Sequence, residues 1–268
     1  MKLLKLLVIL KIKKFNKKVL GNKRDVMSKY KPLIYLIGEG YLGSSIKNIL
    51  VQQGFSVISH QKGFAIDKEL LDKIPGMKII IYLASPNKKE DLINSPRKIY
   101  EKILMELYPF LWEENYQIIY GNSDILFYPE YHDIQPDYQK NFIELNKYFQ
   151  LLEKNSVQSK KNELIPFNFW NIYIPYIYSD DLVDKKPESF YSRVKRNELN
   201  ENFLSEEILN QDISIQSLEN FTLEFLIKLR ELIYYRRFQG RDRFTAGRFE
   251  FIKIKLGTFL ELIQKGTF

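Results

Sequence analysis

Cysteine is absent from this chain of 268 residues, and histidine occurs only as His60 and His132. Without cysteine, disulfide bonds, thiol catalysis and cysteine-ligated metal sites are excluded. Two histidines are too few for a histidine-rich metal centre, and the acidic pair Asp180 and Asp181 fits a solvated loop better than a cation site. We therefore expect no metal. Alanine is scarce as well. Since alanine is the best helix former, we attribute its scarcity to codon usage in an AT-rich genome.

The N-terminal segment, residues 1–30, lacks a long uninterrupted apolar run. Its leucines alternate with lysines, so the apolar stretch is shorter than the about 20 residues of a transmembrane helix. Lys5 and Lys11 also interrupt the region that is apolar in a signal peptide. The segment resembles a mitochondrial presequence in its lack of acids, but it is rich in lysine and poor in serine and arginine. The pattern favours a basic amphipathic extension on a membrane surface. An irregular extension before a domain that begins near Met27 is the alternative.

Charge is distributed unevenly along the chain. Residues 1–30 carry ten Lys and Arg residues against Asp25 alone, a net charge of +9, and residues 228–255 carry +6. Residues 31–227 between them are acidic, with a net charge of −7. An acidic centre argues against a nucleic-acid groove across the main domain. Two basic ends favour contacts with a membrane surface, an acidic protein partner or RNA.

Glycine is clustered at one informative place, Gly38-Glu-Gly40-Tyr-Leu-Gly43. The cluster follows the apolar run Leu33–Ile37 and precedes a helix-like segment, Ser44–Gln53. A strand, a GxGxxG turn and a helix in this order are the fingerprint of dinucleotide binding. The first glycine allows the tight turn, the second lets backbone approach a pyrophosphate, and the third lets the helix pack on the strand. The helix N-terminus then offers free N–H groups to the phosphates.

From residue 33 the chain alternates between strand-like and helix-like runs. The strand-like runs are Leu33–Ile37, Ser56–Ser59, Lys78–Leu83, Gln117–Tyr120 and Ile165–Ile172, and the helix-like runs between them are Ser44–Gln53, Lys68–Ile74, Pro96–Glu113 and Asn141–Lys154. Short strands separated by single helices are typical of a parallel, doubly wound sheet. We therefore predict an α/β fold, with a doubly wound parallel sheet of the Rossmann-like, dinucleotide-binding type over residues 31–180. Residues 181–268 are expected to form a smaller, mainly helical C-terminal part that ends in a basic aromatic tail.

Several stretches resemble the extended short-chain dehydrogenase/reductase family, which includes nucleotide-sugar epimerases and dehydratases. Besides the glycine turn, residues 79–85 look like the family's fourth strand, residues 95–101 like the start of the next helix, and residues 169–175 like its "Phe-Asn-Val-Tyr-Gly-Pro" segment. The resemblance spans roughly residues 31–176 in consistent order. It implies that a dinucleotide contacts the glycine turn and the ends of two strands. The implied contact residues are Gly38, Gly40, Tyr41, Leu42, Gly43, Lys62, Leu83, Ala84 and Ser85.

The resemblance fails at the family's catalytic pair, a Tyr followed four residues later by a Lys. The matching positions hold Phe142 and Asn146. Phenylalanine has no ionisable group, and asparagine has no charge that would lower the pKa of a phenol. The literal match at Tyr191 and Lys195 lies after the family's later landmark instead of before it, so we interpret it as a surface helix turn. Ser123 matches the family's serine that polarises the substrate carbonyl, but it lacks its partners. We therefore assign no catalytic residue and favour a non-catalytic protein over an enzyme.

The end of the second strand carries the signal for cofactor choice. Gln61 stands where the fold places an acidic residue that binds the ribose diol of NAD, and Lys62 follows it. A carboxylate would repel a 2′-phosphate, whereas Gln and Lys accept one, so NADP(H) is favoured over NAD(H). Phe64 replaces the family's acidic residue that contacts adenine. This departure leaves open whether the chain still binds any dinucleotide.

Three functions remain open at this stage. The glycine turn, the missing catalytic pair and the two basic ends favour a non-catalytic or weakly catalytic NADP(H)-binding subunit of a large mitochondrial assembly. Its closest resemblance within the family is to the nucleotide-binding accessory subunit of respiratory complex I, a pseudoenzyme held by protein partners. The first alternative is a nucleotide-sugar epimerase, dehydratase or reductase with atypical catalytic residues, cytoplasmic in an AT-rich bacterium. The second is an organellar ribosome-associated protein that uses the arginines and aromatic residues of its basic tail on RNA.

Overall fold

The computed structural model describes two packed regions of the chain, one around each of two sheets. The described residues are 31–60, 65–84, 96–111, 113–123, 144–145, 147–149, 151, 168–185, 189–199, 202, 204–210, 212–238 and 252–267. The predictions made for residues 1–30 lie outside them. None of the described helices has the length and apolarity needed to cross a membrane.

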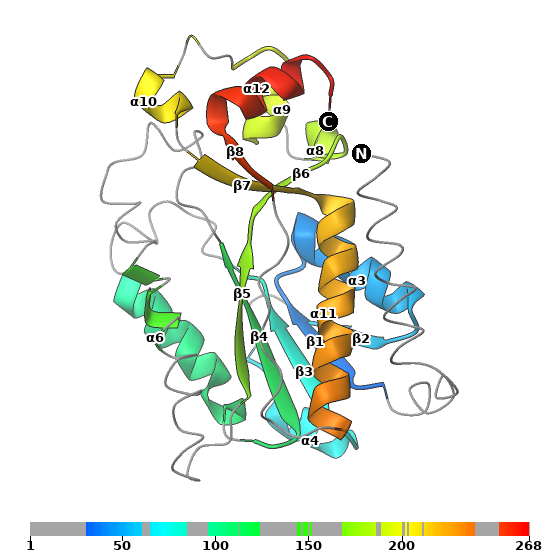
Figure 1. The fold of residues 1–268 in the computed structure, drawn as a ribbon. Helices are drawn as coiled ribbons and strands as arrows, with labels where there is room; N and C mark the ends of the chain where they lie inside the picture. Colours follow the sequence, from blue (N-terminus) through cyan, green and yellow to red (C-terminus); the bar gives the residue numbers. More distant parts are fainter. Residues whose placement is uncertain are drawn as a thin grey trace.

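A five-stranded parallel sheet forms the centre of the larger region (Figure 1). Its strands are β1 (Leu33–Ile37), β2 (Ser56–Ser59), β3 (Lys78–Tyr82), β4 (Tyr116–Ser123) and β5 (Phe169–Ile174). Their order in the sheet is β2-β1-β3-β4-β5, and all four pairings are parallel. The chain first winds outward from β1 to β2 and then returns past β1 to β3. The direction of winding therefore reverses between β1 and β3, as the prediction of a doubly wound sheet requires.

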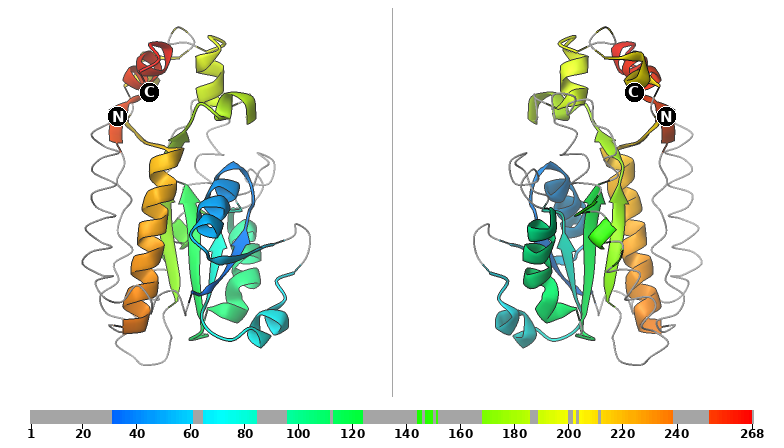
Figure 2. Two further views of the ribbon diagram at one scale, coloured as in Figure 1. Left: turned by 90° about the vertical axis from the view of Figure 1, so that its right-hand side faces the viewer. Right: turned by 90° about the vertical axis from the view of Figure 1, so that its left-hand side faces the viewer.

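Helices cover both faces of this sheet, as the two side views in Figure 2 show. One face carries α3 (Tyr41–Gln52) and α11 (Leu218–Phe238), and the other carries α4 (Lys68–Lys73), α6 (Pro96–Leu107) and the helical residues between 144 and 151. Alternate residues of β1 point to opposite faces, so Leu36 packs with α3 and α11 while Tyr35 packs with α4 and α6. Burial on both faces explains why β1 and β3 read as nearly continuous apolar runs.

A second, three-stranded sheet lies above the carboxyl ends of β1 to β5 (Figure 1). Its strands are β6 (Tyr176–Tyr178), β7 (Asp212–Ser217) and β8 (Ile252–Lys255), and it is accompanied by α8 (Leu182–Lys185), α9 (Phe190–Lys195), α10 (Glu206–Leu209) and α12 (Leu256–Gln264). Strand β6 pairs parallel with β7, and β7 pairs antiparallel with β8. One hydrophobic cluster, which includes Tyr178, Val194 and Phe259, holds this region together.

Most predicted elements agree with the structure, and the differences have local causes. β1 and β2 have the predicted bounds, whereas β5 begins at Phe169 instead of Ile165. Helix α6 ends at Leu107 instead of Glu113 and is followed by a 3-10 turn, Tyr108–Phe110. Pro109 has no backbone N–H, so it cannot donate the hydrogen bond that a further turn of α-helix requires. The three-stranded sheet was not predicted, and α11 covers the five-stranded sheet instead of joining the C-terminal region.

Candidate functional site

The glycine turn lies at the point where the winding of the sheet reverses. Strand β1 ends at Ile37, whose carbonyl oxygen accepts a hydrogen bond of 2.7 Å from the N–H of Leu83 just after β3. Helix α3 begins at Tyr41 with Gly40 as its N-cap residue. In open α/β sheets, ligands bind at such a switch point, outside the carboxyl ends of the strands. The predicted turn therefore occupies the expected place for a ligand site.

Gly38 and Gly43 are needed for close packing within the turn. Gly38 has a φ of +95°, and a Cβ atom there would overlap the backbone of Ala84 and lie 2.6 Å from the carbonyl carbon of Leu83. A Cβ atom on Gly43 would overlap the carbonyl oxygen of Gly38. Any larger residue at either position would push α3 or the end of β3 away from the turn. The structure thus gives these two glycines the roles expected from the sequence.

Gly40 has a different environment. A Cβ atom built there meets no atom of the described residues within 4 Å, so no residue that the structure describes closes the turn on this side. Gly40 is the N-cap residue of α3 and has no side chain that could accept a hydrogen bond from the helix. The first backbone N–H groups of a helix have no partner within the helix. An open glycine beside such N–H groups is the arrangement that lets a pyrophosphate approach the backbone. The residues of the turn therefore fit a dinucleotide phosphate.

One charged pair flanks the turn. Lys47 on α3 donates a hydrogen bond of 2.5 Å to the carboxylate of Glu39, and this hydrogen bond lowers the pKa of Glu39. Glu39 is therefore ionised at neutral pH. Its negative charge beside a phosphate site is offset by the ammonium group of Lys47.

The other predicted contact residues are only partly brought together. Leu42 packs into the cluster beneath α3 and α11, and Leu83 and Ala84 lie beside the glycine turn. Tyr41 instead packs against the cluster of the three-stranded region, and the Lys185 ammonium of α8 lies 5.9 Å from its ring centroid. Lys62 and Ser85 lie outside the described residues, as do Gln61 and Phe64.

The literal Tyr–Lys match lies in the three-stranded region, on α9. Tyr191 is 1% exposed, which corrects its interpretation as part of a surface helix turn. Its hydroxyl donates to the Asp180 carboxylate at 2.9 Å, and the same carboxylate pairs with Lys195 at 3.4 Å. Burial and the hydrogen bond to Asp180 raise the pKa of Tyr191 far above its usual value. A buried, fully protonated phenol that is bound to a carboxylate is suited to holding α9 in place.

The structure describes only some of the residues in the remaining predictions about catalysis and metals. Phe142 and Asn146 lie outside the described residues, and Ser123 is the last residue of β4. Asp180 is engaged as described above, and Asp181 pairs with Lys185 at 3.4 Å. In the part of the chain that the structure describes, no group of three His, Asp or Glu side chains is placed to hold a metal ion.

One feature at the end of β2 was missed by the sequence reasoning. His60 directly follows this strand, and its Nδ1 atom lies 2.9 Å from the hydroxyl of Tyr35 on β1. The sequence signal was the position of His60 just before Gln61, at the end of a strand next to the glycine turn. The partnership with Tyr35 had no sequence signal, since it depends on the register between two strands.

Comparisons with known proteins give a match in structure only. No family model and no curated protein sequence matches the chain. Among solved structures, a GDP-L-fucose synthetase from Naegleria fowleri matches with a TM-score of 0.50 and 13% identity, over 88% of this chain and 78% of the synthetase. A structure of such a synthetase bound to NADP matches with a TM-score of 0.48 and 13% identity, over 89% and 79% of the two chains.

A reductase studied in asymmetric catalysis matches with a TM-score of 0.51 and 12% identity, over 88% of this chain and 83% of the reductase. At these identities the similarity concerns the fold. The chain therefore shares a Rossmann-like fold with the GDP-L-fucose synthetase from Naegleria fowleri and with this reductase.

Proposed function

We propose that this chain binds NADP(H) over its glycine turn. The observation that carries the proposal is the contrast among the three glycines: Gly38 and Gly43 are closed in by backbone, whereas Gly40 is open on the side of the α3 N-terminus. In this arrangement, α3 supplies backbone N–H groups to a pyrophosphate. NADP(H), when bound, would supply a hydride for redox chemistry. The absence of an acidic residue at Gln61 supports NADP(H) over NAD(H).

The test of this proposal is the affinity for NADPH, measured by titration of its fluorescence. A Gly40→Val side chain would fill the open side of the turn, so we expect a loss of affinity of at least about tenfold, which corresponds to about 1.4 kcal/mol. Gly76→Ala is the control for backbone strain alone, because Gly76 has a φ of +92° and lies just before β3, at the amino end of that strand. Lack of NADPH binding by the unmodified chain would overturn the proposal.

We further propose that the bound dinucleotide has little or no role in short-chain-reductase chemistry. The sequence supports this through Phe142 and Asn146, which replace the catalytic pair. The structure supports it through Tyr191, whose hydroxyl is buried and bound to Asp180. Oxidation of NADPH with a panel of keto-sugar nucleotides tests it. A turnover that disappears in Tyr191→Phe would show that the chain is an enzyme with displaced catalytic residues.

A nucleotide-sugar epimerase, dehydratase or reductase is the second candidate. It is favoured by the fold shared with the GDP-L-fucose synthetase and the reductase. Conversion of a nucleotide sugar by the purified chain, with a rate that scales with protein concentration, would establish this candidate in place of the first. A ribosome-associated RNA-binding role rests only on the basic tail, and filter binding of RNA at physiological salt tests it.

The proposed setting is a large assembly, of the mitochondrial respiratory complex I type, in which protein subunits hold the two basic ends. The support is the charge of +9 on residues 1–30 and of +6 on residues 228–255. Deletion of residues 1–26 is expected to abolish co-purification with the parent assembly. β8 and α12 contribute to the hydrophobic cluster of the three-stranded region, so deletion of the C-terminal basic end would also disturb the fold. This end is better tested by replacing Arg241, Arg243 and Arg248 with Glu. Unchanged co-purification of both variants would rule out this setting.

A further inference from the structure

Tyr41, the first residue of α3, connects the glycine turn with the three-stranded region. Its ring packs against the hydrophobic cluster of that region, and the Lys185 ammonium on α8 lies 5.9 Å from the ring centroid. Its hydroxyl oxygen is buried, and burial raises the pKa of this hydroxyl, so it stays protonated at neutral pH. Among the described residues, Tyr41 is the only member of this cluster that precedes Tyr176 in the chain. One side chain of the turn therefore joins the core of the smaller region.

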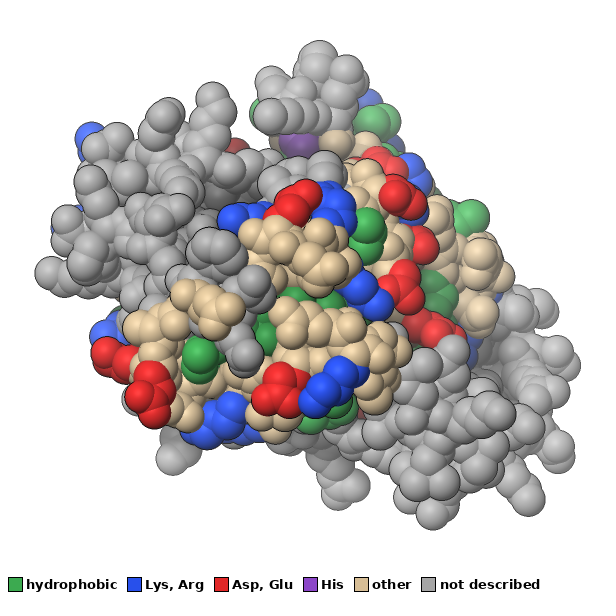
Figure 3. Space-filling view, turned by 90° about the horizontal axis from the view of Figure 1, so that it is seen from above, with side chains coloured by type: hydrophobic (Ala, Val, Ile, Leu, Met, Phe, Trp, Pro, Cys, Tyr) green, Lys and Arg blue, Asp and Glu red, His purple; other side chains and the backbone are tan. Residues whose placement is uncertain are grey.

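The apolar side chains of the smaller region are gathered in this one cluster. Figure 3 views the molecule from above, where the three-stranded region lies, and its described surface shows acidic and basic side chains beside one another, with apolar ones scattered between them. Inside the cluster, Phe259 and Leu260 of α12 are at most 1% exposed. Since Tyr41 packs against this cluster, a change in the packing of the smaller region reaches the glycine turn.

The first turn of α3 depends on tertiary contacts because local stabilisers are missing. Gly40, its N-cap residue, has no side chain that could accept a hydrogen bond, and the first turn contains no acidic residue. A capping side chain and an acidic residue usually stabilise this end of a helix. Instead, Leu42 packs against the cluster beneath α3 and α11, and Tyr41 packs against the cluster of the smaller region. The two regions therefore hold the first turn of α3 between them.

We propose that Tyr41 is a positioning residue that couples the binding of a phosphate-bearing ligand at the glycine turn to the packing of the three-stranded region. This inference rests on the proposed binding of a dinucleotide at that turn. A pyrophosphate needs the backbone N–H groups of the first turn of α3 in place, and the packing of Tyr41 orders this turn before the ligand arrives. Coupling between two sites is reciprocal. The bound ligand therefore stabilises the packing of α9 and α12.

Hydrogen exchange of the full chain, followed by mass spectrometry with and without saturating NADPH, tests the coupling. In the unmodified chain, we expect NADPH to slow exchange in α9 and α12 as well as at the start of α3. Tyr41→Ala removes the ring from the cluster, so NADPH should protect α3 but no longer α9 and α12. The affinity for NADPH should fall at least about fivefold, the lower end of typical coupling between sites. Tyr41→Phe keeps the ring and should retain the protection of both regions.

Leu42→Ala is the matched control, because it removes an apolar side chain from the same turn of α3 on the side of the larger region. It should leave the protection of α9 and α12 by NADPH in place. If Tyr41→Ala does not fold, Tyr41→Leu replaces it, because leucine keeps an apolar side chain at this position but lacks the ring. The same loss of protection in α9 and α12 is expected for this variant.

The outcomes distinguish this inference from the proposed function. If NADPH does not bind the unmodified chain, the proposed function fails, and the inference fails with it. If NADPH binds but protects only the larger region, or protects α9 and α12 equally in Tyr41→Ala, the coupling is refuted while the proposed function stands. Loss of this protection in Leu42→Ala as well would refute the specific role of Tyr41. Loss in Tyr41→Ala, with retention in Tyr41→Phe and Leu42→Ala, would support the inference.

Discussion

The two sheets of this protein meet at the carboxyl ends of β1 to β5, and they differ in how they are stabilised. The five-stranded sheet is covered on both faces, with one hydrophobic cluster on each. The three-stranded sheet depends on a single cluster supplied mainly by α9 and α12. A sheet buried on both faces holds its strand ends in fixed positions. The larger region is therefore the better support for a site made of backbone.

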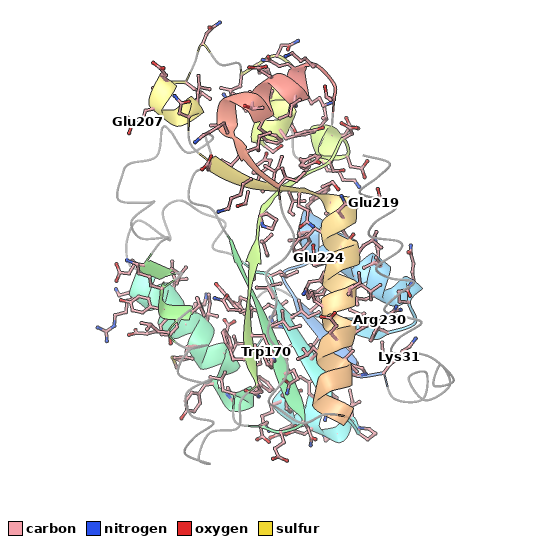
Figure 4. All side chains as sticks on the ribbon, viewed as in Figure 1. Lys31, Trp170, Glu207, Glu219, Glu224 and Arg230 are labelled. Atoms are coloured by element: carbon pink, nitrogen blue, oxygen red, sulfur yellow. The ribbon has the colours of Figure 1, made fainter. Side chains whose placement is uncertain are left out.

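Each region also contains one sequence match to the same enzyme family, and the two matches differ in their surroundings. The glycine turn depends on backbone geometry, and no described atom lies within 4 Å of a Cβ atom built on Gly40. The Tyr–Lys match depends on side chains, and its Tyr191 hydroxyl is buried against Asp180. The side chains of α9 and α12, drawn as sticks in Figure 4, belong to the hydrophobic cluster of the three-stranded region. A short motif thus indicates chemistry only when the fold leaves its reactive atoms accessible.

The largest expected effect concerns the single cluster of the smaller region. Phe259 on α12 is completely buried there, in contact with Tyr176 and Tyr178. We expect Phe259→Ala to lower the free energy of unfolding by about 3–5 kcal/mol, because it leaves a cavity in a core without a second layer. Urea denaturation followed by fluorescence and by circular dichroism measures it. A loss below about 1 kcal/mol would show that the three-stranded region does not depend on this cluster.

The next effect concerns the glycine turn of the larger region. Gly38→Ala places a Cβ atom against the backbone of Ala84 at a positive φ. We expect a loss of about 2–4 kcal/mol in the free energy of unfolding, from overpacking and from the left-handed conformation. Gly40→Ala is the matched variant, since its Cβ meets open space, and it should change stability by less than about 1 kcal/mol. Equal losses in both variants would contradict the geometry of the turn.

A smaller effect is expected at Tyr191, and it sharpens the contrast between the two motifs. Tyr191→Phe removes one hydroxyl that donates to Asp180, while Lys195 still pairs with that carboxylate. The expected cost is about 0.5–1.5 kcal/mol in the free energy of unfolding, with no change in the affinity for NADPH. Thermal unfolding and a fluorescence titration of the same sample check both statements. A stable variant that no longer binds NADPH would place Tyr191 at the site after all.

The smallest effect concerns the pH dependence of stability. Lys68 and Tyr116 both donate to the carboxylate of Asp72, at 2.7 and 2.6 Å, and lower its pKa. A pKa that is lower in the folded than in the unfolded chain stabilises the fold above the unfolded pKa. This contribution disappears as the pH falls through the folded pKa. Asp72→Asn should therefore weaken the loss of stability that sets in as the pH falls below about 4, the ordinary pKa of an aspartate. Identical acid profiles of the unfolding free energy would contradict this account.

Local patterns were sufficient for much of the larger region. The apolar run Leu33–Ile37, the glycine spacing and the helix-like segments led to the parallel sheet and to the glycine turn at its switch point, because strand burial and turn geometry depend on neighbouring residues. The polar alternation of β7 and the short strands β6 and β8 gave too weak a signal. These strands pair across more than 30 residues of chain, and such pairings have no local pattern.

The sequence by itself determined the absence of cysteine chemistry, the order of the strands from β1 to β5, and the need for glycine at Gly38 and Gly43. These properties follow from composition and from short-range spacing. Only the tertiary structure decided that Gly40 is open, that the Tyr191 hydroxyl is buried, and that Tyr35 holds His60 at the end of β2. Each of these depends on contacts between elements that are distant in the chain, and those contacts exist only once the strands have aligned in register.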